Sequence, residues 1–305
     1  MLNTQQILAT NENYKMMSSL LACYPHPQFP TVSITGNECA FNCKHCRARY
    51  LLGMLSCKDP KHLYELCKDF AAKGARGILL SGGFNSDGYV PFEPFLDVIE
   101  RIKEETQLVI SIHTGLPPAW LSRELGRAGV DIADFDLIGD DETIREILGS
   151  DKTVADYSRT LQTLSRHIRW VVPHICIGLH AGKVNGEYRA VDIAVDAGSK
   201  LIVFLILIPT VGTPFQDVRP PPSEEILSVI QYAGERSSSV ELALGCMRPK
   251  ENGRSDLEFK IIQAGVSRIV LPSEQTLRLA RAAGLQVKRV NACCSLPREW
   301  LEVKE

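Results

Sequence analysis

The stretch Asn37-Glu38-Cys39-Ala40-Phe41-Asn42-Cys43-Lys44-His45-Cys46 holds three cysteines in the spacing C-x3-C-x2-C, directly after an apolar run. Three thiolates on one loop are soft ligands that suit an iron–sulfur cluster or zinc. A cubane cluster has four irons, so three cysteines leave one iron free to bind a small molecule. The competing interpretation is a structural zinc site made of the three cysteines and His45, but no second pair of ligands lies nearby. The spacing therefore favours an iron–sulfur cluster with one open iron.

Composition narrows the class of protein. The chain has 305 residues, of which 45% are hydrophobic, enough for one large core. With 34 basic and 36 acidic residues, no bulk charge favours a nucleic acid or a membrane surface as partner. The longest apolar run, 201–209, is too short to span a bilayer and predicts a buried strand. Ten cysteines without a charged and then apolar leader predict a reducing, cytoplasmic location.

Short β-rich runs alternate with amphipathic stretches along most of the chain, which is typical of βα units and a parallel sheet. Several of the amphipathic stretches begin with a proline, as helices often do. The expected strands are 31–36, 77–81, 108–113, 132–138, 170–177, 201–208, 240–244 and 268–271, and the expected helices are 60–73, 91–105, 117–128, 153–167, 222–235 and 273–283.

Eight such strands predict a closed (β/α)8 barrel of the TIM type. We expect the barrel over residues 31–284, an N-terminal extension over 1–30, and a C-terminal extension over 285–305 that folds over the barrel mouth. Parallel strands place their carboxyl ends on one face, so polar residues that follow each strand should converge there.

Two groups of residues at these strand ends are candidates for a site. The second strand ends in Ser81-Gly82-Gly83, where the glycines let backbone approach a ligand closely. His113 and Asp136 end the third and fourth strands and could orient a ligand, although for either alone an ordinary core or loop role is the simpler explanation.

The cysteine spacing, with His45 before the last cysteine, resembles the radical S-adenosylmethionine (SAM) superfamily, in which the open iron chelates SAM. The resemblance implies a [4Fe-4S] cluster on Cys39, Cys43 and Cys46, with His45 at the cofactor. It implies that Ser81-Gly82-Gly83 holds the SAM amino group, although Phe84 stands where many members have an acidic residue. Further positions are expected near the adenosine: Gly178 and Glu187 after the fifth strand, and Pro209 and Gly212 after the sixth.

A second set of cysteines comes late in the chain, in Gly245-Cys246-Met247-Arg248-Pro249 and Ala292-Cys293-Cys294-Ser295. Together with the earlier motifs, these segments resemble the biotin synthase-like branch of the superfamily, and in particular the paired homologues that form lipoyl groups jointly. If the tail folds over the barrel mouth, we expect a second iron–sulfur cluster on Cys246, Cys293 and Cys294, held by one or both of the adjacent pair, with Cys176 as a further candidate ligand. Alternatively, they are ordinary buried cysteines, and adjacent cysteines diverge in extended chain.

The resemblance predicts an enzyme that cleaves SAM reductively and inserts sulfur into an octanoyl chain during lipoyl biosynthesis. It implies three protein partners: an acyl-carrier or lipoyl-domain substrate, a one-electron reductant such as ferredoxin or flavodoxin, and a paired homologous radical SAM protein. One alternative is a radical SAM maturase, methylating or biotin-related enzyme that acts on another small molecule. Another is a non-catalytic iron–sulfur or zinc scaffold protein.

Overall fold

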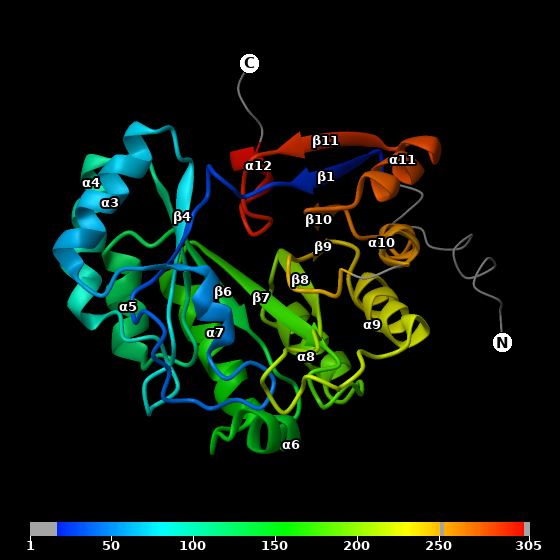
Figure 1. The fold of residues 1–305 in the computed structure, drawn as a ribbon, viewed down its shortest axis with the longest axis horizontal. Coiled ribbons are helices and arrows are strands. Elements are labelled where there is room, and N and C mark those ends of the chain that lie inside the picture. Colours follow the sequence, from blue (N-terminus) through cyan, green and yellow to red (C-terminus); the bar gives the residue numbers. More distant parts are fainter. Residues whose placement is uncertain (1–16, 251–252, 302–305) are drawn as a thin grey trace.

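The computed structural model describes residues 17–250 and 253–301. Within these residues eleven strands form one sheet, in the order β11-β1-β10-β9-β8-β7-β6-β5-β4-β2-β3 (Figure 1). Every pairing is parallel. The strands are β1 (Ser19–Cys23), β2 (Thr31–Ser33), β3 (Leu55–Ser56), β4 (Gly77–Ser81), β5 (Val109–His113), β6 (Ile132–Asp136), β7 (Trp170–Ile177), β8 (Leu201–Ile206), β9 (Glu241–Leu244), β10 (Arg268–Val270) and β11 (Gln286–Val290).

Helices follow most strands and cover the outer side of the curled sheet (Figure 1). All eight expected strands and all six expected helices are confirmed, with ends that differ by a few residues. The sequence patterns missed β1, β3, β11, α8 and α10, and also the short helices η1, α6, η3 and α12. The helices are η1 (Arg49–Gly53), α3 (Pro60–Ala72), η2 (Glu93–Phe95), α4 (Leu96–Glu105), α5 (Ala119–Arg127), α6 (Asp141–Thr143), η3 (Ile144–Leu148), α7 (Val154–His167), α8 (Glu187–Asp196), α9 (Ser223–Arg236), α10 (Arg254–Gln263), α11 (Glu274–Ala282) and α12 (Arg298–Leu301).

The sheet curls but does not close, so the expectation of a closed eight-stranded barrel is wrong. β3 and β11 form its two edges. Two of the three extra strands, β1 and β11, come from the segments expected to lie outside the barrel, and β1 pairs with both β10 and β11. β1 therefore extends the sheet beside β10 instead of bonding to β2. Residues 1–16 and 302–305 of those two segments lie outside the described residues.

The segment that follows β11 packs against the amino ends of the strands. The Trp170 indole, at the first residue of β7, donates to the Ser295 carbonyl (2.8 Å), and Arg268, at the first residue of β10, donates to the Cys294 carbonyl (2.9 Å). Arg76, just before β4, donates to the Trp300 carbonyl (2.6 Å). The described part of this segment is therefore bonded to the amino ends of these strands and not, as expected, placed over their carboxyl ends.

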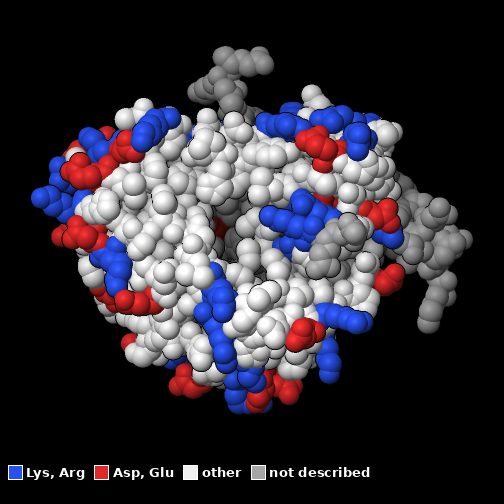
Figure 2. All heavy atoms as spheres, in the orientation of Figure 1, with Lys and Arg blue, Asp and Glu red and all other residues white. Residues whose placement is uncertain are grey.

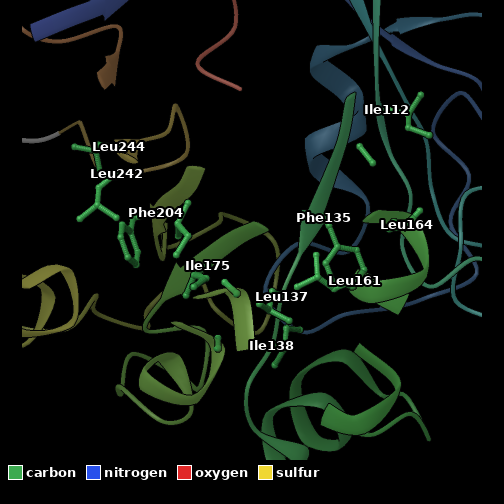
Figure 3. Close-up of a cluster of buried hydrophobic side chains, with 14 of the residues drawn as sticks. Ile112, Phe135, Leu137, Ile138, Leu161, Leu164, Ile175, Phe204, Leu242 and Leu244 are labelled. Carbon is green, nitrogen blue, oxygen red and sulfur yellow. The ribbon is translucent and has the colours of Figure 1, made fainter. Parts of the chain in front are cut away.

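Strand residues alternate between the helices and the inside of the curl, as the period of two requires. In β6, Ala133 and Phe135 pack toward the helices, whereas Ile132 belongs to the inner cluster that also contains Leu296. Phe135 lies beside Leu161 and Leu164 of α7 (Figure 3). This leaves residues 134 and 136 on the inner side, where two carboxylates replace core residues. None of the helices in the described parts of the chain is long and apolar enough to cross a membrane.

Candidate active site

The first cysteine loop follows β2 and lies over the carboxyl end of the sheet. The ligand atoms of Cys43, His45 and Cys46 all lie within 4.8 Å of one another. Cys39 lies beside the end of β4, where the Phe84 N–H donates to its sulfur (3.3 Å). A Cβ on Gly83 would overlap the Glu38 carbonyl and Cys39, so only glycine lets the two loops approach this closely.

Electrostatics within this loop favour ionisation of one thiol. The Cys43 thiol hydrogen-bonds to the Cys46 sulfur and so lowers the pKa of Cys46, with a further contribution from His45. The same hydrogen bond, together with burial, raises the pKa of Cys43. Nδ1 of His45 is buried and has no partner among the described residues. The Cys43 and Cys46 sulfurs and the His45 ring, with Cys39 on the same loop, form a donor set that fits a soft metal centre.

A cavity of about 420 Å³ extends from this loop into the curl of the sheet. A hollow with acidic atoms inside it is visible at the centre of Figure 2. Among the described residues, the cavity lining includes three carboxylates, Asp134, Asp136 and Glu187, and no lysine or arginine. Most of the remaining lining is apolar, so a bound molecule would be largely shielded from water. The candidate residues that line the cavity are Cys39, Cys43, His45, Cys46, Ser81, Gly82, Gly83, His113, Asp136, Glu187, Cys246, Cys293 and Cys294.

Gly178, Pro209 and Gly212 are not part of this lining. Gly178 has φ +88°, and a Cβ there would overlap the Pro221 ring. A Cβ on Gly212 would overlap the Arg49 guanidinium, next to the hydrogen bond between the Tyr50 and Thr210 hydroxyls (2.9 Å). These glycines pack loops against one another, and their contact with a nucleotide stays a prediction.

Glu187 begins α8 and is 5% exposed. Its Oε1 accepts the Gly178 N–H (2.8 Å) and its Oε2 accepts the Asn185 N–H (2.6 Å). Burial raises the pKa of this carboxyl, and the backbone donors act in the opposite direction. Glu187 therefore holds the loop after β7 in place while it lines the cavity.

Polar side chains cross the inner side of β4 to β7. Ser81 Oγ and His113 Nδ1 lie 3.2 Å apart, and the ring of His113 packs edge-on against that of His174, with centroids 6.1 Å apart. Ser111 Oγ donates to Asp134 Oδ2 (2.6 Å). Asp136 lies two residues further along β6 on the same side. The sequence interpretation missed Asp134, although strand alternation with Asp136 was the signal that could have found it.

The late cysteines meet at the same cavity. The pKa of Cys294 is raised by its hydrogen bond to Cys293, by burial, and by the nearby Cys293, Cys23 and Cys246 thiols. The pKa of Cys293 is lowered by the hydrogen bond from Cys294, against burial and the Asp134 charge. Cys23 is fully buried and does not line the cavity.

Arg248, which follows Cys246 by two residues, turns away from the cavity. Its side chain is 2% exposed and forms an ion pair with Glu258 (Nη2 to Oε1, 2.6 Å). It also donates to the Gly245 carbonyl (2.5 Å) and the Val270 carbonyl (2.8 Å). Arg248 thus ties the loop that carries Cys246 to the end of β10.

Comparison with known proteins shows which kind of domain carries this site. Residues 33–182, which contain the cysteine loop and β2 to β7, match the family described as Radical SAM superfamily. Residues 33–182 form a radical SAM domain. The cofactors of this family are a [4Fe-4S] cluster and SAM, so in the radical SAM domain Cys39, Cys43 and Cys46 are the thiols that fit the cluster.

Solved structures agree with this fold. Methylornithine synthase (PylB) superposes with a TM-score of 0.60 at 14% identity, over 94% of this chain and 87% of that one. The hydrogenase maturase HydG from Carboxydothermus hydrogenoformans gives 0.67 at 13% identity, over 96% and 73%. Streptococcus suis SuiB bound to S-adenosylmethionine gives 0.56 at 10% identity, over 92% and 60%. At such identities the likeness shows the fold alone. No curated protein matches the chain significantly.

Proposed function

We propose that this radical SAM protein inserts sulfur into an octanoyl chain carried on a lysine of a lipoyl-domain or acyl-carrier protein, with sulfur drawn from a second cluster on Cys246, Cys293 and Cys294. When bound, the reduced first cluster supplies the electron that splits SAM into methionine and a 5′-deoxyadenosyl radical, which removes hydrogen from an unactivated carbon. The protein's own task is to position the reactants and exclude water.

The observation that carries the proposal is that one cavity reaches both cysteine sets. Its lining contains Cys39, Cys43 and Cys46 at one end of the chain and Cys246, Cys293 and Cys294 at the other. A radical made at the first set would therefore share an enclosed space with sulfur held at the second. Three cysteines on an apolar cavity wall could simply be buried apolar residues. Because both cysteine sets line one cavity, a single substrate could reach both.

The charge of the lining supports an amide-linked substrate. Among the described lining residues no lysine or arginine could pair with the carboxylate of a free fatty acid. Burial of an unpaired carboxylate beside Asp134, Asp136 and Glu187 would be costly. An octanoyl amide is neutral, and its chain matches the apolar walls. His113 and Asp136 then act as positioning groups for the SAM ribose or for the substrate.

The test is anaerobic reconstitution with iron and sulfide, followed by incubation with SAM, a reductant such as flavodoxin, and an octanoylated lipoyl-domain peptide. Mass analysis should show peptide mass gains that correspond to sulfur in place of hydrogen, together with 5′-deoxyadenosine. A paired homologous protein is added in a parallel reaction, because two proteins could share the two insertions. Formation of 5′-deoxyadenosine without any sulfur gain in either reaction would refute sulfur insertion and favour a maturase or methylating enzyme.

The number of iron and zinc ions per chain distinguishes the proposed enzyme from a non-catalytic scaffold protein. Two cubanes require about eight irons per chain, one requires about four, and a zinc site requires none. A protein that holds zinc, or that fails to bind SAM after reconstitution, would be a scaffold rather than an enzyme.

A further inference from the structure

Asp134 is a buried carboxylate, and only one of its two oxygens accepts a hydrogen bond. It is 2% exposed, and Ser111 Oγ donates to its Oδ2 (2.6 Å). Its Oδ1 has no partner among the described residues, although it is buried. An ionised group that is buried and only partly satisfied costs several kcal/mol, so native proteins rarely leave one without a partner.

Among the described residues, no neighbouring group lies within hydrogen-bond range of Oδ1. His174 Nε2 lies 4.0 Å from Asp134 Oδ1, beyond hydrogen-bond range. His174 Nδ1 lies 3.0 Å from the Val172 carbonyl, which can only accept, so Nδ1 donates its proton there and this hydrogen bond fixes the position of the ring. No lysine or arginine belongs to the described lining, and the His174 ring is the only basic group within 4.0 Å of Oδ1 in the described parts of the chain. What satisfies it must enter the cavity.

The cysteines beside Asp134 indicate what that group is. Cys246, Cys293 and Cys294 supply three sulfurs, whereas a cubane has four irons. Cys23 does not line the cavity. Cys176 does line it, but the charges that act on Cys176 are those of Asp136 and Glu187. Asp134 also lines the cavity and is the carboxylate whose charge acts on Cys293. Carboxylate oxygen is a common ligand of iron in proteins.

We propose that Asp134, through Oδ1, is the fourth protein ligand of the second cluster, beside Cys246, Cys293 and Cys294. The inference rests on the second cluster of the proposed function, and it assigns one iron of that cluster an oxygen ligand in place of sulfur. The first cluster keeps an open iron for SAM, whereas the second has all four irons held by the protein.

The test isolates the second site in the full-length chain. Cys39, Cys43 and Cys46 are replaced by alanine, and the protein is reconstituted anaerobically with iron and sulfide. We expect about four irons per chain in this background. Adding Asp134→Ala should leave one iron without a protein ligand, so that mild oxidation lowers the content to about three irons and produces the electron paramagnetic resonance signal of an oxidised three-iron cluster, whereas the background protein should keep about four irons under the same oxidation. Asp136→Ala is the matched control, because Asp136 lines the same cavity from the same strand, and it should leave four irons.

A second variant keeps the test decisive if Asp134→Ala fails to fold. In the same background, Mössbauer spectra should show one iron distinct from the other three, and Asp134→Cys should make all four alike while preserving the iron count. Four irons with unchanged spectra in Asp134→Ala and Asp134→Cys would overturn the role of Asp134 and leave the second cluster standing. A background protein that binds no iron would remove the second cluster, and with it both the proposed sulfur source and this ligand.

Discussion

Glu258 is the point at which the fold around the Cys246 loop should be most vulnerable. Its Oε1 accepts from Arg248 (3.0 Å from Nε and 2.6 Å from Nη2) and from Arg254 (2.5 Å). Its Oε2 accepts from the Thr276 hydroxyl (2.5 Å) and the Ser273 N–H (3.1 Å). Both oxygens are thus surrounded by donors. In Glu258→Gln an amide NH2 group faces at least one of these donors. The substitution also removes the negative charge that neutralises Arg248.

The expected loss is about 3–5 kcal/mol in the free energy of unfolding, the cost of removing one partner of a buried ion pair. Both side chains are 2% exposed, so solvent screening does little to reduce this figure. The matched control is Glu274→Gln, which breaks an ion pair with Arg289 whose side chains are 66% and 52% exposed. That substitution should cost less than about 1 kcal/mol.

The assay is urea denaturation of iron-free protein, monitored by far-ultraviolet circular dichroism. The free energies of unfolding of the variants are compared where the dependence on urea concentration is the same. Arg248→Met, combined with Glu258→Gln, should lose about 0.5–3 kcal/mol less than the sum of the two single variants, because residues in direct contact are coupled. A loss below about 1 kcal/mol for Glu258→Gln, or strict additivity in the double variant, would refute this account of the Cys246 loop.

Cys43→Ala should abolish formation of 5′-deoxyadenosine under reducing anaerobic conditions, because the first cluster loses one of its three thiolates; retained product, measured by liquid chromatography, would contradict the assignment. Cys246→Ala should retain 5′-deoxyadenosine formation but lose sulfur transfer to the octanoylated peptide; if mass analysis still finds sulfur in the product, the second-cluster proposal fails. Gly83→Val should lower the iron content of the first site, since its side chain would displace the loop at Cys39, and an unchanged count would contradict that packing. Burial opposes ionisation of Glu241, but hydrogen bonds and charge from Arg268 hold its pKa at about 2. Its folded-state pKa is thus below the unfolded value, so this stabilisation is present above about pH 4.5 and is lost as the pH falls toward 2. Glu241→Gln should weaken that acid dependence in urea unfolding, and an unchanged pH profile would count against it.

Most strands and helices could be predicted because patterns within each short segment of sequence determine them. Buried parallel strands are continuous apolar runs, and the helices between them carry apolar residues at helical spacing, so eight strands and six helices could be placed. β1 and β11 were missed because each is a short run that becomes a strand only by pairing with a distant one: β1 with β10 and β11, across more than two hundred residues. Contact with partners so remote in sequence leaves no local periodicity.

The sequence by itself determined the first site, because its three cysteines lie within eight consecutive residues and their spacing alone sets their chemistry. Only the tertiary structure brought Cys246, Cys293 and Cys294 to the same cavity, revealed the unsatisfied oxygen of Asp134, and placed the C-terminal segment at the amino ends of the strands. The physical reason is the separation in sequence between the residues that must come together. Ligands close together in the chain share one loop whatever the rest of the fold does, whereas burial and long-range contact depend on how every strand is ordered in the sheet.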